Sequence, residues 1–236
     1  MQRFAQGHTQ RLATDFDHVA ARYDTLQHFN PGYRSDLLRS ARRLAAPADG
    51  HILDVCCGTG LSTAALREVY PAAQITGVDI SAGMLATARK KPELRAVRFI
   101  AGDAMELEQC GAQGPYDGIL MAYGIRNVPD PDLCLTRLRE RLKPGARIVF
   151  HEYSVAGSLV SRAVWNTVAA AVIVPLGAAF TGSGELFRYL RKSVNEFDSI
   201  EQFERRLGSA GFVQVRAEPM AGWRRGIVHS VIAERA

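Results

Sequence analysis

The sequence predicts an α/β fold built on a doubly wound, mostly parallel sheet of seven strands. Three observations indicate this fold. Apolar strand-like segments alternate with helix-like segments over 51–153, the chain of 236 residues is long enough for one large domain, and two strand-like segments follow each other at the C-terminal end. Apolar strands alternating with helices are typical of a parallel sheet with helices on both faces, and two successive strands favour an antiparallel hairpin at its edge.

Each element has a local reason. Strands are expected over 51–57, 74–80, 97–102, 116–122 and 146–153, and helices over 59–69, 81–90 and 132–142. Ser81 is a plausible N-cap, and the Lys-Pro-Gly sequence at 143–145 stops the third helix. A helix over 200–210 ends at Gly211, and strands over 212–218 and 226–234 complete the sheet.

The pattern predicts a single domain, 1–236, with four parts. Residues 1–46 form a helical cap, in which Phe16, Val19, Tyr23 and Leu26 have helical spacing. Residues 47–154 form the core, 155–197 a lid insertion, and 198–236 the last helix and the hairpin.

Residues 163–184 of the insertion carry no charge, which suggests a buried helix, an apolar lid or a transmembrane span. The interruptions at Asn166, Pro175 and Gly177 disfavour the span.

Composition excludes several classes of protein. The net charge is +5, but the basic residues are dispersed, so solvated helix faces explain them better than a nucleic-acid surface. The first 14 residues lack the apolar stretch of a signal peptide, and four cysteines in a chain of this size do not form a disulfide framework. No metal-ligand spacing occurs, and we expect a cytoplasmic protein with reduced thiols.

A glycine turn closes the first strand. Gly58 and Gly60 allow a tight turn and a close approach of the backbone to a ligand, and the following helix offers free N–H groups. Asp79, nineteen residues after Gly60, ends the second strand, where a carboxylate accepts hydrogen bonds from a ribose. The pattern predicts a cofactor that contains adenosine. The alternative is an ordinary strand–helix turn with Asp79 as a helix cap.

The type of cofactor follows from one position. A dinucleotide fingerprint needs a small residue where this chain has Thr63, which disfavours a nicotinamide-dependent oxidoreductase. S-adenosylmethionine has no phosphate, so a shorter glycine turn with the upstream carboxylate of Asp54 suffices. Asp103, at the end of the third strand, is a candidate acceptor for the adenine amino group or a turn-forming residue.

Several motifs resemble the class I S-adenosylmethionine-dependent methyltransferases, a Rossmann-like fold class, and more narrowly the ubiquinone/menaquinone biosynthesis C-methyltransferase family. The resemblance covers most of the chain, and AYGIRNV at 122–128 is its most distinctive match. The other matching segments are 16–24, 54–60, 77–81 with Met84 and Leu85, 142–145, and 187–190 with Ser193, Val194 and Phe197.

The resemblance implies a set of cofactor contacts. They are Thr59, Asp79, Asp103, Ala104 and Ala122, together with Ile80 and Met84 of the cofactor motifs. Ala122 stands where the family often has serine, Lys192 where it has glutamate, and 222–229 replaces a glycine-rich stretch. The last two departures lie on the substrate side. The resemblance therefore indicates the type of reaction better than the identity of the methyl acceptor.

Methyl transfer to a ring carbon needs a group that favours ionisation of a neighbouring hydroxyl. Arg126 and Asn127 follow the fourth strand and are candidates to stabilise the phenolate and to orient the ring; His151 is a candidate base, and Tyr23 and Tyr189 are candidates to line the pocket. The alternatives are that Arg126 pairs with an acid, Asn127 caps a turn, His151 is an ordinary half-buried histidine and the tyrosines pack.

We therefore expect an enzyme that methylates a quinol or phenolic ring of a lipophilic acceptor. The alternative within the same fold is C-, N- or O-methylation of a small secondary metabolite. Nucleic-acid and protein amine methyltransferases commonly carry Asn/Asp-Pro-Pro-Tyr where this chain has 122–125, and no acidic triad for magnesium is evident. Expected partners are a small apolar aromatic substrate, a membrane surface contacted peripherally and a second copy of the chain, without nucleic acid.

Overall fold

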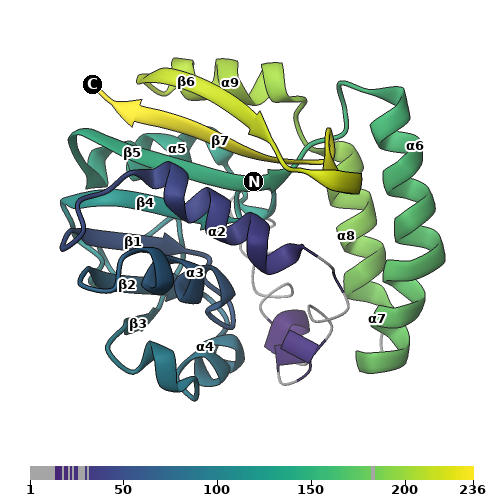
Figure 1. Cartoon of the computed structure of the whole chain (residues 1–236), viewed down its shortest axis with the longest axis horizontal. Helices are drawn as coiled ribbons and strands as arrows, with labels where there is room; N and C mark the ends of the chain where they lie inside the picture. The colour runs from purple at the N-terminus through teal and green to yellow at the C-terminus, as the bar shows by residue number, and fades with distance from the viewer. Residues whose placement is uncertain are drawn as a thin grey trace.

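The computed structural model describes residues 14–17, 19, 20, 22, 24, 25, 30, 32–181 and 184–236. Its sheet has seven strands in the order β3-β2-β1-β4-β5-β7-β6 (Figure 1), which confirms the predicted fold class. The strands are β1 His51–Val55, β2 Gln74–Asp79, β3 Arg98–Ala101, β4 Tyr116–Ala122, β5 Leu142–Tyr153, β6 Phe212–Pro219 and β7 Val228–Arg235.

The first five strands run parallel, and β7 lies antiparallel between β5 and β6. The strand order reverses between β1 and β4, and ligands of such sheets bind at the carboxyl ends of the strands at this point. On the outer strand β6 the register shifts between Val213 and Arg216, where Gln214 has a positive φ of 51°. This irregularity is a β-bulge in an edge strand.

Helices cover both faces of the sheet (Figure 1). The two faces are filled by alternate residues of the same strands. Ile119 and Phe150 pack in the cluster that includes helices α5 and α9, whereas Leu120 and Val149 pack in the cluster that includes α2 and α3. The helices are α2 Tyr33–Leu44, α3 Leu61–Val69, α4 Ala82–Ala88, α5 Pro131–Arg141, α6 Leu159–Val168, α7 Val174–Thr181, α8 Glu185–Glu196 and α9 Ile200–Ser209.

Two of the boundaries that differ from the sequence-based expectation have a local cause. Helix α3 begins at Leu61 rather than Thr59, because Gly58 and Gly60 have left-handed φ values of 55° and 83° and extend the turn. Strand β5 begins at Leu142, so the Lys-Pro-Gly sequence at 143–145 lies inside the strand instead of separating it from α5.

The insertion contains one long helix, Leu159–Phe180, formed by α6, a π-helical turn at Ala169–Ile173 and α7. Pro175 lacks an N–H donor, and the wider turn directly before it accommodates the lost hydrogen bond. Of the described helices, this one is long and apolar enough to cross a membrane, with a mean hydropathy of 1.8. Only 17% of its most apolar window is buried, so the alternative of a core helix is wrong.

The long helix packs on α8, which lies beside it at one end of the molecule (Figure 1). The Asn166 amide donates to Asn195 Oδ1 at 2.9 Å, and Arg191 Nε donates to Asn166 Oδ1 at 2.8 Å. Asn166, which seemed an interruption in an apolar run, thus fixes α6 to α8.

Candidate active site

Asp54 does not reach the candidate cofactor site. Its side chain is completely buried and accepts hydrogen bonds from Ser62 Oγ at 2.8 Å and Thr63 Oγ1 at 2.6 Å. Burial raises the pKa of Asp54 to about 7, and the two hydroxyl donors oppose this shift. Asp54 therefore ties the first turn of α3 to β1 and does not line the cavity, and its cofactor contact stays a prediction.

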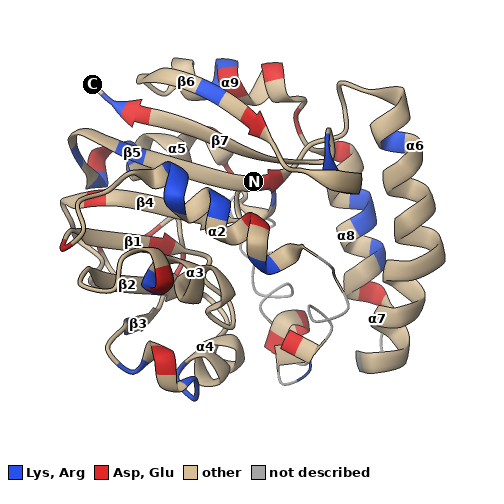
Figure 2. Ribbon diagram, in the orientation of Figure 1, with Lys and Arg blue, Asp and Glu red and all other residues tan. Residues whose placement is uncertain are grey.

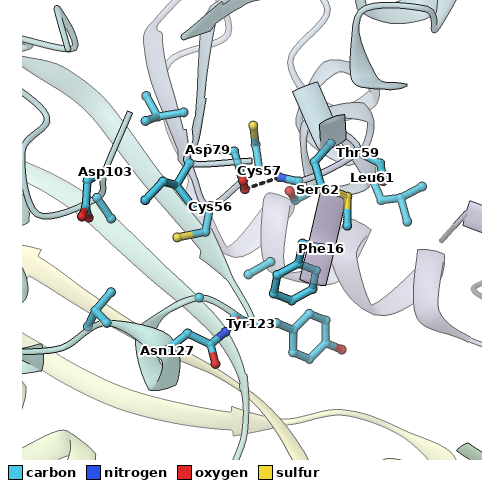
Figure 3. Close-up of a pocket in the computed structure, with 18 of the residues that line it drawn as sticks. Phe16, Cys56, Cys57, Thr59, Leu61, Ser62, Asp79, Asp103, Tyr123 and Asn127 are labelled. Atoms are coloured by element: carbon cyan, nitrogen blue, oxygen red, sulfur yellow. Dashed lines mark hydrogen bonds between the residues drawn. The ribbon is translucent and has the colours of Figure 1, made fainter. Parts of the chain in front are cut away.

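The glycine turn and Asp79 form one hydrogen-bonded unit. The backbone N–H of Gly58 donates to Asp79 Oδ2 at 2.8 Å (Figure 3), and that of Ser81 donates to Oδ1 at 2.9 Å. Burial raises the pKa of Asp79, and these backbone donors favour its ionised form. The carboxylate is thereby fixed at the tip of β2.

The two glycines have different roles. A Cβ built on Gly58 meets no atom within 4 Å, and Gly58 lines a cavity, so the missing side chain leaves room for a ligand. A Cβ on Gly60 would lie 2.7 Å from Leu94 Cδ1. Gly60 packs against the turn at Pro92–Leu94 and does not line the cavity, and its cofactor contact stays a prediction.

The first cavity, of about 160 Å³, lies at the carboxyl ends of β1, β2, β3 and β4 (Figure 3). Asp103 lines it and also forms a turn, because its Oδ1 accepts from the Met105 N–H at 2.8 Å. Most of the predicted cofactor-binding residues share this wall: Gly58, Thr59, Asp79, Ile80, Met84, Asp103, Ala104 and Ala122.

Residues of the N-terminal cap contact the loops of this cavity. Asp24 accepts a hydrogen bond from Thr59 Oγ1 at 2.6 Å and pairs with Lys91 Nζ at 2.6 Å. Asp17 accepts from the Ser81 hydroxyl and from the Gly83 N–H at 2.8 Å, at the first turn of α4. Both carboxylates belong to the 16–24 motif, and neither was assigned a role from the sequence. Tyr23, predicted to line the ring pocket, lies outside the described residues.

A second cavity, of about 290 Å³, lies between the long helix of the insertion, α8 and the ends of β4 and β5. Its wall is mainly apolar and aromatic, and Tyr189 contributes to it as predicted. The residues that line both cavities are Phe16, Tyr33, Tyr123, Arg126 and Asn127. The two cavities therefore adjoin at the predicted catalytic turn.

Arg126 lies on the short turn Ile125–Asn127 after β4. Its Nη1 forms an ion pair with Glu152 and donates to the Tyr123 carbonyl at 3.0 Å, and its Nε donates to Ser193 Oγ at 3.3 Å. Arg126 thus pairs with an acid, as the alternative expected, and it also lines both cavities. Burial raises the pKa of Glu152, and Arg126 opposes that shift.

Asn127 bridges the turn and helix α8. Its amide donates to the Tyr123 carbonyl at 3.1 Å, and its Oδ1 accepts from the Tyr189 hydroxyl at 3.1 Å. Asn127 therefore fixes Tyr189 in the wall of the second cavity, in addition to lining that cavity itself.

His151 lines neither cavity. It is completely buried, and its Nε2 lies 2.8 Å from the Tyr123 hydroxyl. Burial, together with the nearby charges of Arg224 and Arg43, lowers the pKa of His151 to about 3. His151 is thus neutral at pH 7 and separated from the cavities by Tyr123, which favours the alternative of an ordinary buried histidine. Its role as a base stays a prediction.

The C-terminal segment contributes a residue that sequence reasoning missed. Trp223 lines the second cavity and is 42% exposed, and the guanidinium carbon of Arg224 lies 5.7 Å from its ring centre. Arg224 is itself buried and pairs with Asp36 of α2 at 3.0 Å. The departure from the family pattern at 222–229, which contains Trp223, was the available signal.

The strand order and the glycine–Asp79 unit at the carboxyl ends of the strands define a class I S-adenosylmethionine-dependent methyltransferase. A model of the ubiE/COQ5 methyltransferase family matches residues 5–233, and the chain belongs to this family. Demethylmenaquinone methyltransferase of Staphylococcus aureus strain JH9 is 30% identical over 211 residues, which are 88% of this chain and 87% of that protein.

Solved structures share the fold. A methyltransferase from Thermotoga maritima has a TM-score of 0.67 at 18% identity, over 95% of this chain and 100% of that chain. Phosphoethanolamine N-methyltransferase 2 of Haemonchus contortus, solved with S-adenosylmethionine, has a TM-score of 0.62 at 17% identity, over 85% of this chain and 52% of that one.

The cofactor of this family is S-adenosylmethionine, and the first cavity fits it. Of the described residues in its wall, Asp79 and Asp103 are the acidic ones and Arg126 is the one Lys or Arg, already paired with Glu152. A pyrophosphate would find no free cation in this part of the wall, whereas a positively charged sulfonium compound suits it. Asp79 would hold the ribose, and Val78, Ile80 and Ala104 offer apolar surface to the base.

Proposed function

We propose that this protein methylates a ring carbon of a quinol or phenol that carries an apolar chain. The observation that supports this proposal best is the second cavity, whose mainly apolar wall adjoins the cofactor cavity at Tyr123, Arg126 and Asn127. An apolar pocket with a few polar groups at one end suits an aromatic head group with an oily tail. The name of the similar Staphylococcus aureus protein, demethylmenaquinone methyltransferase, supports the same class of acceptor.

The residues contribute position and a dry environment. Bound S-adenosylmethionine supplies a methyl group whose bond to sulfur breaks, both electrons going to sulfur, as a ring carbon bonds to the methyl carbon. Phe16 and Tyr123 contribute aromatic rings where the cavities adjoin (Figure 3), and they limit how the acceptor ring can lie. The hydrogen bonds of Arg126 to the described residues use Nε and Nη1, which leaves Nη2 as a donor for a ring oxygen.

Methylation of a small secondary metabolite is the competing function. Trp223 lines the second cavity and belongs to the segment 222–229, which departs from the family pattern, and this favours a different acceptor. The test is incubation with labelled S-adenosylmethionine and either prenylated or unprenylated 1,4-dihydroxynaphthalene, followed by mass analysis of the product. We expect C-methylation with a much higher kcat/KM for the prenylated acceptor. Equal values, or a methyl group on oxygen, would contradict the proposal. The Asp79→Ala variant serves as the control with weakened cofactor binding.

A lipophilic acceptor resides in a membrane, and we propose that the insertion docks on an anionic bilayer surface. Leu159 and Val160 on α6 are 85% and 74% exposed, and Val172 and Leu176 are exposed and also line the second cavity. Figure 2 shows that α6 and α7 carry almost no charged residues, whereas α8 beside them carries several basic ones. The exposed charged residues of α6 and α8 are four basic ones, Arg162, Arg188, Arg191 and Lys192, and two acidic ones, Glu185 and Glu196. Lys192 pairs with Glu196, and the two helices together keep an excess of positive charge.

An exposed apolar helix flanked by cations is typical of peripheral membrane contact. Cosedimentation with phosphatidylglycerol vesicles tests it, with phosphatidylcholine vesicles for comparison. We expect stronger binding to the anionic vesicles and weaker binding after Leu159→Ser with Val160→Ser. Leu133→Ser is the matched control, because Leu133 is a 41% exposed apolar residue on α5. Equal binding by the two variants would contradict the proposed surface.

A further inference from the structure

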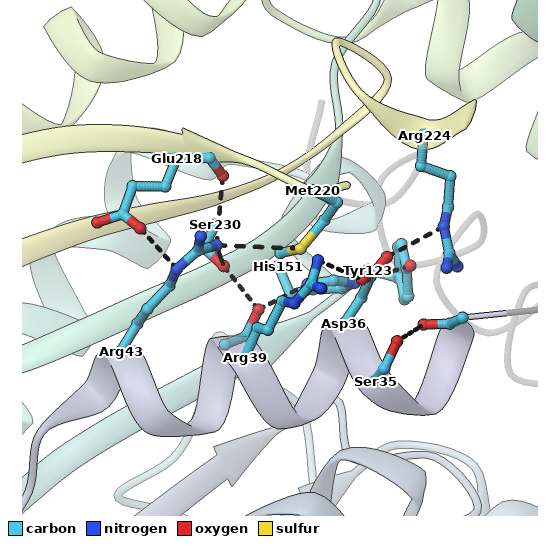
Figure 4. Close-up of polar contacts among 12 residues, drawn as sticks. Ser35, Asp36, Arg39, Arg43, Tyr123, His151, Glu218, Met220, Arg224 and Ser230 are labelled. Atoms are coloured by element: carbon cyan, nitrogen blue, oxygen red, sulfur yellow. Dashed lines mark hydrogen bonds and ion pairs between the residues drawn. The ribbon is translucent and has the colours of Figure 1, made fainter. Parts of the chain in front are cut away.

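A chain of polar groups runs between α2 and the sheet to the wall that the two cavities share (Figure 4). Arg43 Nη1 donates to Ser230 Oγ at 2.8 Å, and Ser230 Oγ lies 2.7 Å from Ser40 Oγ. Ser40 Oγ lies 2.7 Å from His151 Nδ1, and His151 Nε2 lies 2.8 Å from the Tyr123 hydroxyl. Ser40, Ser230 and His151 are completely buried.

The hydrogens of this chain have one consistent direction. If Ser40 donated to Ser230, the Ser230 hydrogen would have no acceptor among the described residues, although the side chain is buried. Buried donors in folded proteins are almost always satisfied. Ser230 therefore donates to Ser40, and Ser40 donates to His151 Nδ1. His151 then carries its proton on Nε2 and donates it to the oxygen of Tyr123.

The Tyr123 hydroxyl is left with a hydrogen to donate. Because its oxygen accepts from His151, its own O–H has no acceptor in the described part of the chain, and Tyr123 lines both cavities. The ring is fixed on several sides, with its centre 4.8 Å from both the His151 and Tyr153 rings and 5.7 Å from the Tyr33 ring. The backbone of Tyr123 has a positive φ of 57°, a costly conformation that turns this residue out of β4.

We propose that Tyr123 donates a hydrogen bond to the oxygen of the acceptor ring, and that His151, Ser40 and Ser230 are positioning residues that hold its hydroxyl as a donor. This inference rests on the proposed function only in taking a ring oxygen as the ligand. The hydroxyl keeps its own proton, and the proton of the acceptor hydroxyl leaves to bulk water when the acceptor binds as a phenolate. Donation to a negatively charged oxygen is a stronger hydrogen bond than donation to a neutral one.

The charges around the chain agree with a donor rather than a base. Arg43, Arg224 and His229 face His151, and together with burial they keep the imidazole neutral at pH 7. A proton passed through Tyr123 to His151 would create a second buried positive charge beside these groups.

Binding of 4-nitro-1-naphthol in the presence of S-adenosylhomocysteine tests the inference, because the naphtholate is seen directly by its absorbance. We expect wild-type protein to lower the pH at which bound naphthol ionises, and Tyr123→Phe to raise this midpoint by about one pH unit or more, a tenfold change in the ionisation constant. Tyr70→Phe is the matched control, since the Tyr70 hydroxyl is buried and bonded to Ala41 and Ala46 away from the cavities. An equal midpoint in wild type and Tyr123→Phe, or no naphthol binding by wild type, would overturn the inference.

The positioning residues are tested by conservative pairs. His151→Gln keeps an N–H donor and is expected to retain the wild-type midpoint, whereas His151→Leu and Ser40→Ala are expected to raise it without changing cofactor affinity. A purely structural role predicts the same loss of stability but no change in the midpoint. If the naphthol results hold and prenylated quinols are not methylated, the proposed function fails and the inference stands. If prenylated quinols are methylated but the ionisation midpoint of bound naphthol is the same in wild type and Tyr123→Phe, the proposed function stands and the inference fails.

Discussion

Arg126 and Glu152 form a buried ion pair that joins the carboxyl ends of the neighbouring strands β4 and β5 beside both cavities. The two side chains are only 6% and 2% exposed. Breaking a buried pair is costly, because the remaining charge has no partner and little water. The pair therefore contributes to stability and to the site at once, and a variant must separate the two effects.

Arg126→Ala is expected to lower the free energy of unfolding by about 3–5 kcal/mol, because Glu152 remains buried without its cation. Turnover should fall far more than cofactor affinity. Urea unfolding and calorimetric titration with S-adenosylmethionine measure the two effects. The double variant Arg126→Met with Glu152→Gln should recover most of the stability and none of the turnover. Wild-type turnover in either variant would remove Arg126 from the mechanism.

Asp79→Ala is expected to raise the dissociation constant of S-adenosylmethionine at least about tenfold, since the variant loses the acceptor for the ribose and the bond to Gly58. Calorimetric titration measures the constant. Asp54→Asn is the comparison, because Asp54 lies outside the cavity wall. A larger loss of cofactor affinity in Asp54→Asn than in Asp79→Ala would show that the assignment of the two carboxylates is reversed.

Trp223→Ala is expected to raise KM for a prenylated acceptor about tenfold, because the variant loses apolar contact area in the second cavity. Cofactor affinity should stay the same, since Trp223 is not in the wall of the first cavity. Steady-state kinetics with a prenylated dihydroxynaphthalene provide the measurement. A parallel loss of cofactor affinity would mean that the substitution disturbs the fold rather than the acceptor site.

The buried His151 makes stability depend on pH. Its pKa in the folded state is about 3, below the value of about 6.5 expected in the unfolded chain, so the unfolded state gains a proton first as the pH falls. The resulting loss of folding stability is absent above pH 6.5 and grows as the pH falls from 6.5 to 3. Between pH 7.5 and pH 5 it amounts to about 2 kcal/mol.

Urea unfolding of wild type and His151→Gln at pH 7.5 and pH 5 measures this penalty as the difference between the two proteins. The comparison is needed because burial raises the pKa of Asp54 to about 7, which acts on stability in the opposite direction over the same interval. His229, with its pKa lowered to about 4, remains in both proteins. Identical pH dependence of the two proteins would show that His151 is accessible to protons in the folded state.

The sheet and its order follow from local patterns, and so do Gly58 and Asp79, which lie at the ends of strands. Asp54 and His151 could not be placed from the sequence, because their strands are buried on both faces. Ile52 and Val149 pack with α2 and α3, and Asp54 and His151, two positions further along the same strands, face those helices as well.

The roles of Asp24 and Trp223 depend on segments far apart in the chain. Asp24 reaches Thr59 and Lys91, and Trp223 comes from the turn between β6 and β7 to a cavity formed mainly by the insertion. The motif that contains Asp24 and the departure that contains Trp223 were visible in the sequence. Their partners follow only from the three-dimensional arrangement.

The bulge at Gln214 affects how this protein associates with other molecules. A straight, unpaired border strand is a template on which a second polypeptide can add its own backbone. The kink in β6 interrupts that row of donors and acceptors. Pairing of β6 with an edge strand of a second copy is therefore disfavoured. This lowers the tendency to aggregate in a protein that also exposes an apolar helix.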